Sequence, residues 1–218
     1  MKQEWLKKEN SNKKLVIFFA GWSCDKEQFD GVMDFENCDI YITYDYTTIE
    51  PLEINYTTYS KITVIAWSLG VYVASTTSLP GDSITIAING SPIPVDNKFG
   101  IPKKSFELTI SSLRDHGMAL FNRRISKGVD NFTPTSRQID PLVNELTSLY
   151  ATIQTNPANC KAWEYAIIAQ NDLIFPPQNL LNYWNKKAIF APILIEAPHY
   201  PFNSECMRIL KEIIEIDK

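Results

Sequence analysis

The residues most suited to chemistry lie in AWSLG, residues 66–70, where an apolar run ends at a single serine. Residues 61–67 are typical of a buried strand, and Ser68 begins a segment typical of a helix. A nucleophile on so sharp a strand-to-helix turn needs small neighbours two places away on each side, and here they are Ala66 and Gly70. The pattern predicts a nucleophilic hydroxyl, although an ordinary serine N-cap would fit the same five residues.

A serine nucleophile needs a base to accept its proton, and the chain contains only two histidines. His199 follows the apolar run 192–197, at the point where a last strand gives way to a last helix. His116 lies in a segment that we expect to be helical, where a surface role or a contact within that segment is the simpler interpretation. We therefore predict that His199 is the base.

The base in turn needs an acid to orient it, and two carboxylates are candidates. Asp172 ends the run 163–172, just before a helix that begins with proline. Glu196 is the alternative, but it lies three residues before His199 and would have to reach it from within the same strand end. We predict Asp172, because the order serine, acid, histidine is typical of an open parallel sheet whose strand ends carry the site. A turn or helix-start aspartate is the structural alternative.

A hydroxyl that attacks a carbonyl also requires donors for the oxyanion. The residue after the nucleophile supplies one N–H group, here that of Leu69, and the loop after the first central strand supplies the second. That loop is FFAGWSCD, in which Gly21 allows a turn and Trp22 is the candidate donor. The Trp22 ring would also line the pocket, unless it is simply a core aromatic.

These residues must be positioned by a sheet, and the chain supplies one. Apolar, β-branched runs without strict alternation are typical of parallel strands buried on both faces, and they recur at residues 14–21, 39–46, 61–67, 82–90, 163–172 and 192–199. Helices are expected at about 25–35, 68–79, 176–187 and 202–216. The order predicts an α/β protein with a mostly parallel, doubly wound sheet, and QEWLKK near the start could add an antiparallel edge strand.

One long segment breaks this alternation. Residues 100–158 contain no convincing strand, and the stretches 106–125 and 141–154 are typical of helices. An insertion of this size between two strands is most simply a helical lid over the strand ends. We therefore expect a core formed by residues 1–99 and 159–218, with a lid inserted at 100–158.

Composition excludes several classes of function. The chain has 218 residues, 44% of them hydrophobic, which is typical of one α/β domain. A net charge of −4 argues against general nucleic-acid binding, and no apolar run is long enough for a membrane span or a signal peptide. The cysteines are scattered, so we expect a cytoplasmic protein with reduced thiols and no metal site; they are Cys24, Cys38, Cys160 and Cys206.

The expected lid carries the opposite charge from the rest of the chain. Residues 103–137 contain seven basic and three acidic residues, so this segment has a charge of +4. A basic lid on an acidic body indicates an acidic partner at the mouth of the site, although a solvated helix face would show the same composition. The basic residues predicted to meet that partner are Arg114, Arg123, Arg124 and Lys127.

Beyond these local patterns, the chain resembles the α/β-hydrolases and, more narrowly, the BioG-type pimeloyl-acyl carrier protein methyl ester esterases of bacterial biotin synthesis. The resemblance extends over most of the chain from residue 14 onward. It rests on FFAGWSCD, YDY at 44–46, IAWSLGVYVA, INGSPIPVDNKFGIP at 88–102, FNRRI at 121–125 and PHYPF at 198–202.

This resemblance implies hydrolysis of the methyl ester of pimeloyl-acyl carrier protein to pimeloyl-acyl carrier protein and methanol. It implies the nucleophile Ser68, the acid Asp172 and the base His199, an acyl carrier protein as partner, and no metal or organic cofactor. Aromatic residues would line an acyl channel, with Trp22, Phe106, Phe121 and Tyr150 as candidates that could equally be lid core.

Other functions use the same residues. An acyl thioesterase or a small-ester carboxylesterase would show the same three catalytic residues, because fold and acyl-transfer chemistry do not fix the substrate. A non-catalytic protein that binds an acyl chain or the carrier protein is a second alternative, which the presence of all three residues disfavours. A lyase or haloperoxidase-like use of the triad is a third.

Overall fold

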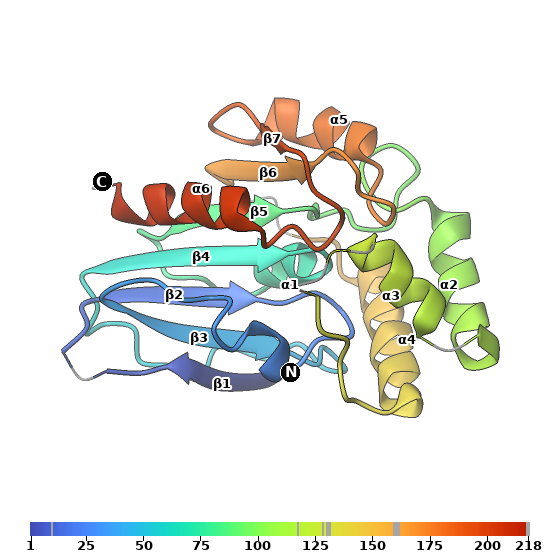
Figure 1. Ribbon diagram of the computed structural model, residues 1–218, viewed down its shortest axis with the longest axis horizontal. Coiled ribbons are helices and arrows are strands. Elements are labelled where there is room, and N and C mark those ends of the chain that lie inside the picture. Colours follow the sequence, from blue (N-terminus) through green and yellow to red (C-terminus); the bar gives the residue numbers. More distant parts are fainter. Residues whose placement is uncertain (10, 117, 128, 130–131, 159–161, 217–218) are drawn as a thin grey trace.

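The computed structural model in Figure 1 describes residues 1–9, 11–116, 118–127, 129, 132–158 and 162–216. Seven strands form one sheet in the order β1-β3-β2-β4-β5-β6-β7. All neighbouring strands are parallel except β1, which pairs antiparallel with β3 at the edge, as the sequence predicted. The strands are β1 (Lys2–Lys7), β2 (Lys14–Phe19), β3 (Cys38–Tyr44), β4 (Lys61–Trp67), β5 (Ile84–Ile88), β6 (Tyr165–Ala169) and β7 (Ile193–Ile195).

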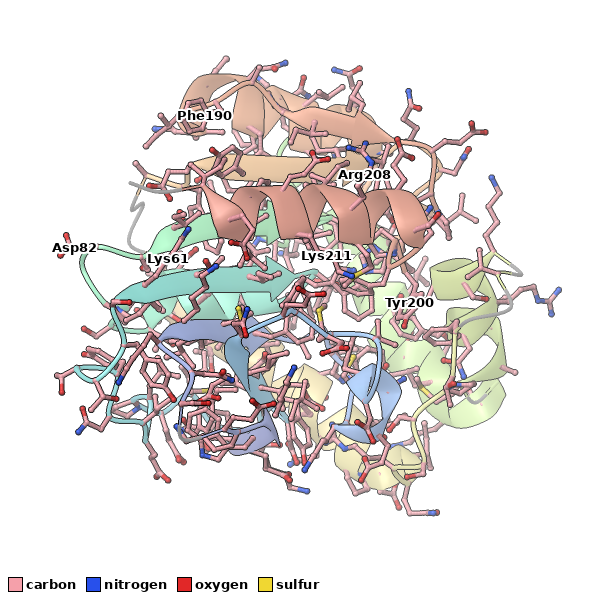
Figure 2. The ribbon with its side chains drawn as sticks, turned by 60° about the vertical axis from the view of Figure 1, so that its left-hand side comes forward. Lys61, Asp82, Phe190, Tyr200, Arg208 and Lys211 are labelled. Carbon is pink, nitrogen blue, oxygen red and sulfur yellow. The ribbon has the colours of Figure 1, made fainter. Side chains whose placement is uncertain are left out.

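Helices cover both faces of the sheet, because successive residues of the central strands point to opposite sides. One face of the sheet packs against α1 (Gly70–Thr76) and α5 (Pro177–Lys187). The other face packs against α6 (Ser204–Glu215) and the segment that holds the short 3-10 turn Glu27–Phe29. Helix α6 crosses the front of the sheet in Figure 2, with Ile209 and Leu210 buried and the labelled Arg208 and Lys211 exposed.

The insertion between β5 and β6 is helical and lies beyond the carboxyl ends of the parallel strands (Figure 1). It contains α2 (Lys103–His116), α3 (Ala119–Ser126) and α4 (Ile139–Thr155), and we call residues 100–158 the lid. The stretch 106–125, predicted to be helical, is divided between α2 and α3. Among the described helices, none combines the length and the apolar content required to cross a bilayer.

The helix predicted at about 25–35 is also absent. Apart from the short turn Glu27–Phe29, this segment consists of turns and bends. Phe29, Met33 and Phe35 have helix-like spacing and are buried, but Gly31 has a φ of 72° and so interrupts any helix. Burial of these three side chains against β2 and α6 therefore does not require a helical backbone.

A buried carboxylate at the end of the sheet opposite the lid holds the amino-terminal segment in place. Asp39 is fully buried at the start of β3, and its side chain accepts hydrogen bonds from Lys8, Asn12, Tyr59 and the N–H of Glu9. Burial alone would raise the pKa of Asp39, but these donors outweigh that effect and lower the pKa to about 2. The carboxylate is therefore charged at neutral pH and ties the β1–β2 connection to β3.

Candidate active site

Ser68 occupies the sharp turn between β4 and α1. Its φ is 58°, a left-handed conformation that costs a non-glycine residue about 1–3 kcal/mol, and its N–H donates to the carbonyl of Ile88 at 2.9 Å. Gly70 is required because a Cβ there would lie 2.4 Å from the backbone oxygens of Phe19 and Ala20. The small residue predicted from the sequence therefore allows helix α1 to pack directly against the end of β2.

The structure brings Ser68, His199 and Asp172 into one chain of hydrogen bonds. The Nε2 atom of His199 lies 2.9 Å from the Ser68 Oγ atom, and its Nδ1 atom lies 2.7 Å from Asp172 Oδ2. All three residues are buried, with exposed fractions of 6% or less. Glu196, the alternative acid, is exposed and does not contact the imidazole, whose Nδ1 already has a carboxylate partner.

The acid is itself oriented by the loop that follows β6. Asp172 Oδ1 accepts the N–H groups of Ile174 at 2.7 Å and Phe175 at 2.9 Å, which leaves Oδ2 for the histidine. The ring of Phe175 stacks on the imidazole of His199 with an interplanar angle of 8°. These contacts fix both the carboxylate and the ring plane of His199.

Sequence reasoning missed Trp67 and Asn89, which hold the backbone of the histidine loop. The Trp67 indole and the Asn89 side-chain amide both donate to the carbonyl of His199, each at 2.9 Å. The Asn89 amide oxygen also accepts the N–H of Ala169 at 2.7 Å, so this residue joins the ends of β5, β6 and the histidine loop. The Asn-Gly pair at the end of β5 was visible in the sequence, but its long-range partners were not.

The two predicted oxyanion donors, Trp22 and Leu69, both line the pocket next to Ser68. They are 4% and 3% exposed, and within the described part of the chain neither backbone N–H donates to another residue. A Cβ on Gly21 would lie 3.1 Å from the Trp67 ring, so glycine there lets the Trp22 loop approach Ser68 closely. Buried backbone donors are normally paired, so these two N–H groups are available for a ligand oxygen.

A pocket of about 590 Å³, including its open mouth, leads to Ser68 and His199. Its walls are mainly apolar, and the polar side chains of Ser105 and Thr109 on α2 and Arg124 on α3 also line it. Phe106 and Phe121 line the pocket as expected, and the Phe121 ring packs edge-on against Trp22 with a centroid distance of 4.6 Å.

The remaining lid residues lie outside this pocket. Tyr150 packs behind Phe106 and donates to Glu107 at 2.8 Å, so the structure does not place it in contact with a pocket ligand. Arg123 and Lys127 are exposed on and after α3, and the exposed Arg114 pairs with Asp140. The side chain of His116 lies outside the described residues, as does Cys160.

Two other ionisable groups lie near the site, but burial keeps both neutral, so neither can accept a proton there. Burial raises the pKa of the Cys24 thiol well above its usual value, and it raises the pKa of Tyr200 to about 12. Tyr200 follows His199 and lies at the junction of the sheet and the lid, where it is labelled in Figure 2. Both groups are neutral near pH 7. In the part of the chain that the structure describes, no cluster of histidine, cysteine or acidic side chains could hold a metal ion.

The fold and the site define an α/β-hydrolase. A lipase-esterase related protein from Clostridium acetobutylicum superimposes with a TM-score of 0.63 at 15% identity, over 97% of each chain. The crystal structure of BioG from Haemophilus influenzae superimposes with a TM-score of 0.81 at 31% identity, over 93% of this chain and 95% of that one. The mostly parallel sheet is therefore that of a known hydrolase architecture.

The chain also matches one particular family within this fold. Residues 1–206 match the family described as pimeloyl-ACP methyl esterase BioG, and the chain belongs to this family. A protein from Bacteroides fragilis named malonyl-[acyl-carrier protein] O-methyltransferase is 34% identical over 183 residues. That match covers 80% of this chain, but the chain spans only 37% of the length of that relative.

Proposed function

We propose that this protein hydrolyses the methyl ester of pimeloyl-acyl carrier protein in biotin synthesis, releasing methanol and pimeloyl-acyl carrier protein. The observation that carries the proposal is the buried hydrogen-bond chain from Ser68 through His199 to Asp172 at the base of a mainly apolar pocket. Family membership supplies the substrate class. The name of the Bacteroides fragilis relative also refers to an acyl-carrier protein, which supports a carrier-bound substrate.

The geometry supports a two-step acyl transfer. His199 Nε2 accepts the Ser68 proton while Oγ attacks the ester carbonyl carbon, and Asp172 stabilises the imidazolium that forms. The imidazolium then donates its proton to the methoxy oxygen, and methanol leaves. Water, deprotonated by the same histidine, attacks the acyl-serine, and the collapse of this second intermediate returns the proton to Ser68 and releases the carboxylic acid.

Both tetrahedral intermediates carry negative charge on the former carbonyl oxygen. The backbone N–H groups of Trp22 and Leu69 bind this oxyanion, because they line the pocket beside Ser68 and have no other acceptor among the described residues. One such preorganised donor contributes roughly 3 kcal/mol to catalysis. Trp22 and Leu69 therefore account for a large part of the rate.

The methylene chain of the substrate lies along the apolar walls formed by Trp22, Phe106 and Phe121. Tyr150 supports the ring of Phe106 from behind rather than contacting substrate. Arg124 lies on the pocket wall and is exposed, so it meets the carrier end of the substrate, and the exposed Arg123 and Lys127 follow the same helix and its end. Arg114 contributes less, because Asp140 already pairs with it.

A comparison of two substrates tests the carrier assignment. We expect kcat/KM to be higher for the carrier-bound methyl ester than for a free methyl ester of the same diacid. Charge reversal by Arg123→Glu, at an exposed residue outside the pocket, should lower kcat/KM for the carrier-bound ester about tenfold and leave the free ester within twofold. Lys211→Glu makes the same charge change on the exposed face of α6, away from the pocket, and serves as the control.

Equal effects of both variants on both substrates would remove the physical basis for the carrier protein as partner. Product analysis separates the neighbouring activities, because a thioesterase releases the carrier thiol whereas the proposed esterase releases methanol. In cells that lack their own esterase for this step, the wild-type gene should restore growth without biotin, and Ser68→Ala should not. Restoration by Ser68→Ala would overturn the proposed mechanism.

A further inference from the structure

The loop that carries Trp22 is held in place by the lid. The Trp22 indole donates to the carbonyl of Leu142 at 2.9 Å, and the Gln28 amide donates to the carbonyl of Thr133 at 2.7 Å. Asp25 accepts the N–H of Ser136 at 3.2 Å. The contacts join residues more than 100 positions apart, so the conformation of this loop depends on the lid.

A buried ion pair lies at the centre of this junction. Glu145 on α4 is fully buried, and its Oε2 atom accepts from Arg137 at 2.8 Å. The same Arg137 nitrogen donates to the carbonyl of Cys24 at 3.0 Å, and its second terminal nitrogen lies 3.2 Å from Asp45. Glu145 Oε1 also accepts the N–H of Tyr46 at 2.9 Å. One guanidinium therefore joins the Trp22 loop, the lid and the end of β3.

Two strained residues lie beside these contacts. Ser23, between Trp22 and Cys24, has a φ of 64°, and Asp45 has a φ of 55°. A left-handed non-glycine residue is strained and persists only where its surroundings fix it. The carbonyl of Cys24 is the anchor nearest to Ser23, so loss of Arg137 would let this turn relax and carry the Trp22 N–H with it.

We propose that Arg137 and Glu145 are positioning residues for the reaction, because they hold the Trp22 N–H in the place from which it binds the oxyanion. This inference rests on the proposed function of Ser68. Neither side chain lines the pocket or touches substrate, so both act through the loop. Docking of the lid and completion of the oxyanion site are then one structural event.

The electrostatics of the pair make it possible to remove one partner. Burial and, to a smaller extent, the nearby Asp45 raise the pKa of Glu145, whereas Arg137 and the N–H of Tyr46 lower it, and the net pKa is about 7. Without Arg137 the carboxyl would be neutral near pH 7. Arg137→Met therefore leaves no unpaired buried anion at position 145, and we expect this variant to fold with reduced stability.

The test measures kcat, KM and melting temperature with p-nitrophenyl acetate, a small ester that needs no carrier. In Arg137→Met and Glu145→Gln we expect kcat to fall 10- to 100-fold and KM to change less than threefold, because a misplaced oxyanion donor weakens the transition state more than the bound ester. Arg137→Lys should retain more activity than Arg137→Met, since an ammonium can still contact the Cys24 carbonyl.

Asp39→Asn is the matched control, because it also removes a buried carboxylate from an ion pair but lies at the opposite end of the sheet from Ser68. We expect it to lower the melting temperature and to leave kcat unchanged at temperatures where it is folded. The inference is overturned if Arg137→Met or Glu145→Gln keeps kcat within twofold of wild type. It is also overturned if Asp39→Asn loses as much kcat at equal stability.

The outcome remains informative if Arg137→Met does not fold, because Glu145→Gln keeps the size of the buried side chain and is judged by the same twofold limit. Ser68→Ala separates this inference from the proposed function. If Ser68→Ala is inactive while the Arg137 and Glu145 variants are fully active, only the positioning role fails. If Ser68→Ala hydrolyses the ester at the wild-type rate, the proposed function itself fails.

Discussion

Replacement of Asp172 by asparagine separates the two roles of this carboxylate. Asp172 Oδ1 accepts two backbone N–H groups and shapes its loop, whereas Oδ2 accepts from His199 Nδ1. An asparagine can keep its oxygen on the loop, which places its NH₂ group against Nδ1. The imidazole must then accept at Nδ1 and carry its proton on Nε2, 2.9 Å from Ser68 Oγ. In that tautomer it cannot accept the serine proton.

We therefore expect Asp172→Asn to fold normally and to lose about 10³- to 10⁴-fold in kcat, which corresponds to about 4–5 kcal/mol of transition-state stabilisation. Steady-state kinetics with a small ester near pH 7.5 measures the loss, and thermal unfolding checks the fold. Glu196→Gln is the control, since Glu196 is an exposed acid three residues before His199, and its kcat should stay within twofold. Asp172→Asn with more than a tenth of wild-type kcat, or an equal loss in Glu196→Gln, would refute this account of the acid.

Three further predictions concern the supports of the site and of the fold. Gly70→Ala should destabilise the protein by about 1–3 kcal/mol and lower kcat at least tenfold, because the added Cβ would meet two backbone oxygens and displace the turn at Ser68. Chemical denaturation measures the loss of stability, and steady-state kinetics measures the loss of kcat. Asn89→Ala should lower the free energy of unfolding by about 1–3 kcal/mol, because it leaves the buried N–H of Ala169 without an acceptor. It should also lower kcat about tenfold, because the carbonyl of His199 loses a donor and the histidine loop loosens. Unchanged unfolding and kinetics would contradict both expectations. The pKa of Asp39 is lowered from 3.8 to about 2, so its charged form contributes about 2 kcal/mol of stability above pH 4, which is lost as the pH falls from 4 to 2. The free energy of unfolding, measured by denaturation between pH 4 and pH 2, should therefore fall more steeply with decreasing pH for wild type than for Asp39→Asn.

Local sequence patterns predicted the sheet and placed the candidate site residues at strand ends, because the end of a strand is visible as a change in residue type. The small residues Ala66 and Gly70 flank Ser68, and the structure shows that a side chain at residue 70 has no room. Sequence alone left Asp172 and Glu196 as rival partners for the histidine. Only the structure shows which of the two carboxylates contacts His199. Both follow a strand, and their distances from the imidazole depend on the conformation of the loops.

Predictions failed where packing at long range decides the outcome. The apolar residues near 29–35 have helix-like spacing, but a left-handed Gly31 interrupts the segment and burial is achieved without a helix. Arg137 was counted as one of several lid charges, yet it pairs with the buried Glu145 and binds a carbonyl 113 residues earlier in the chain. Nothing in the neighbouring residues distinguishes it from an exposed arginine, because its partners come from other elements.

The hydrogen bond between Ser68 and His199 spans 131 positions of the chain, and helix α6 packs against the sheet only after that histidine has been added. A polypeptide still emerging from the ribosome therefore has Ser68 without its hydrogen-bond partner until residue 199 has been added. Premature termination upstream of residue 199 should yield fragments that cannot cleave esters. Turnover of a chromogenic ester could then report, in real time, when newly made chains complete their fold.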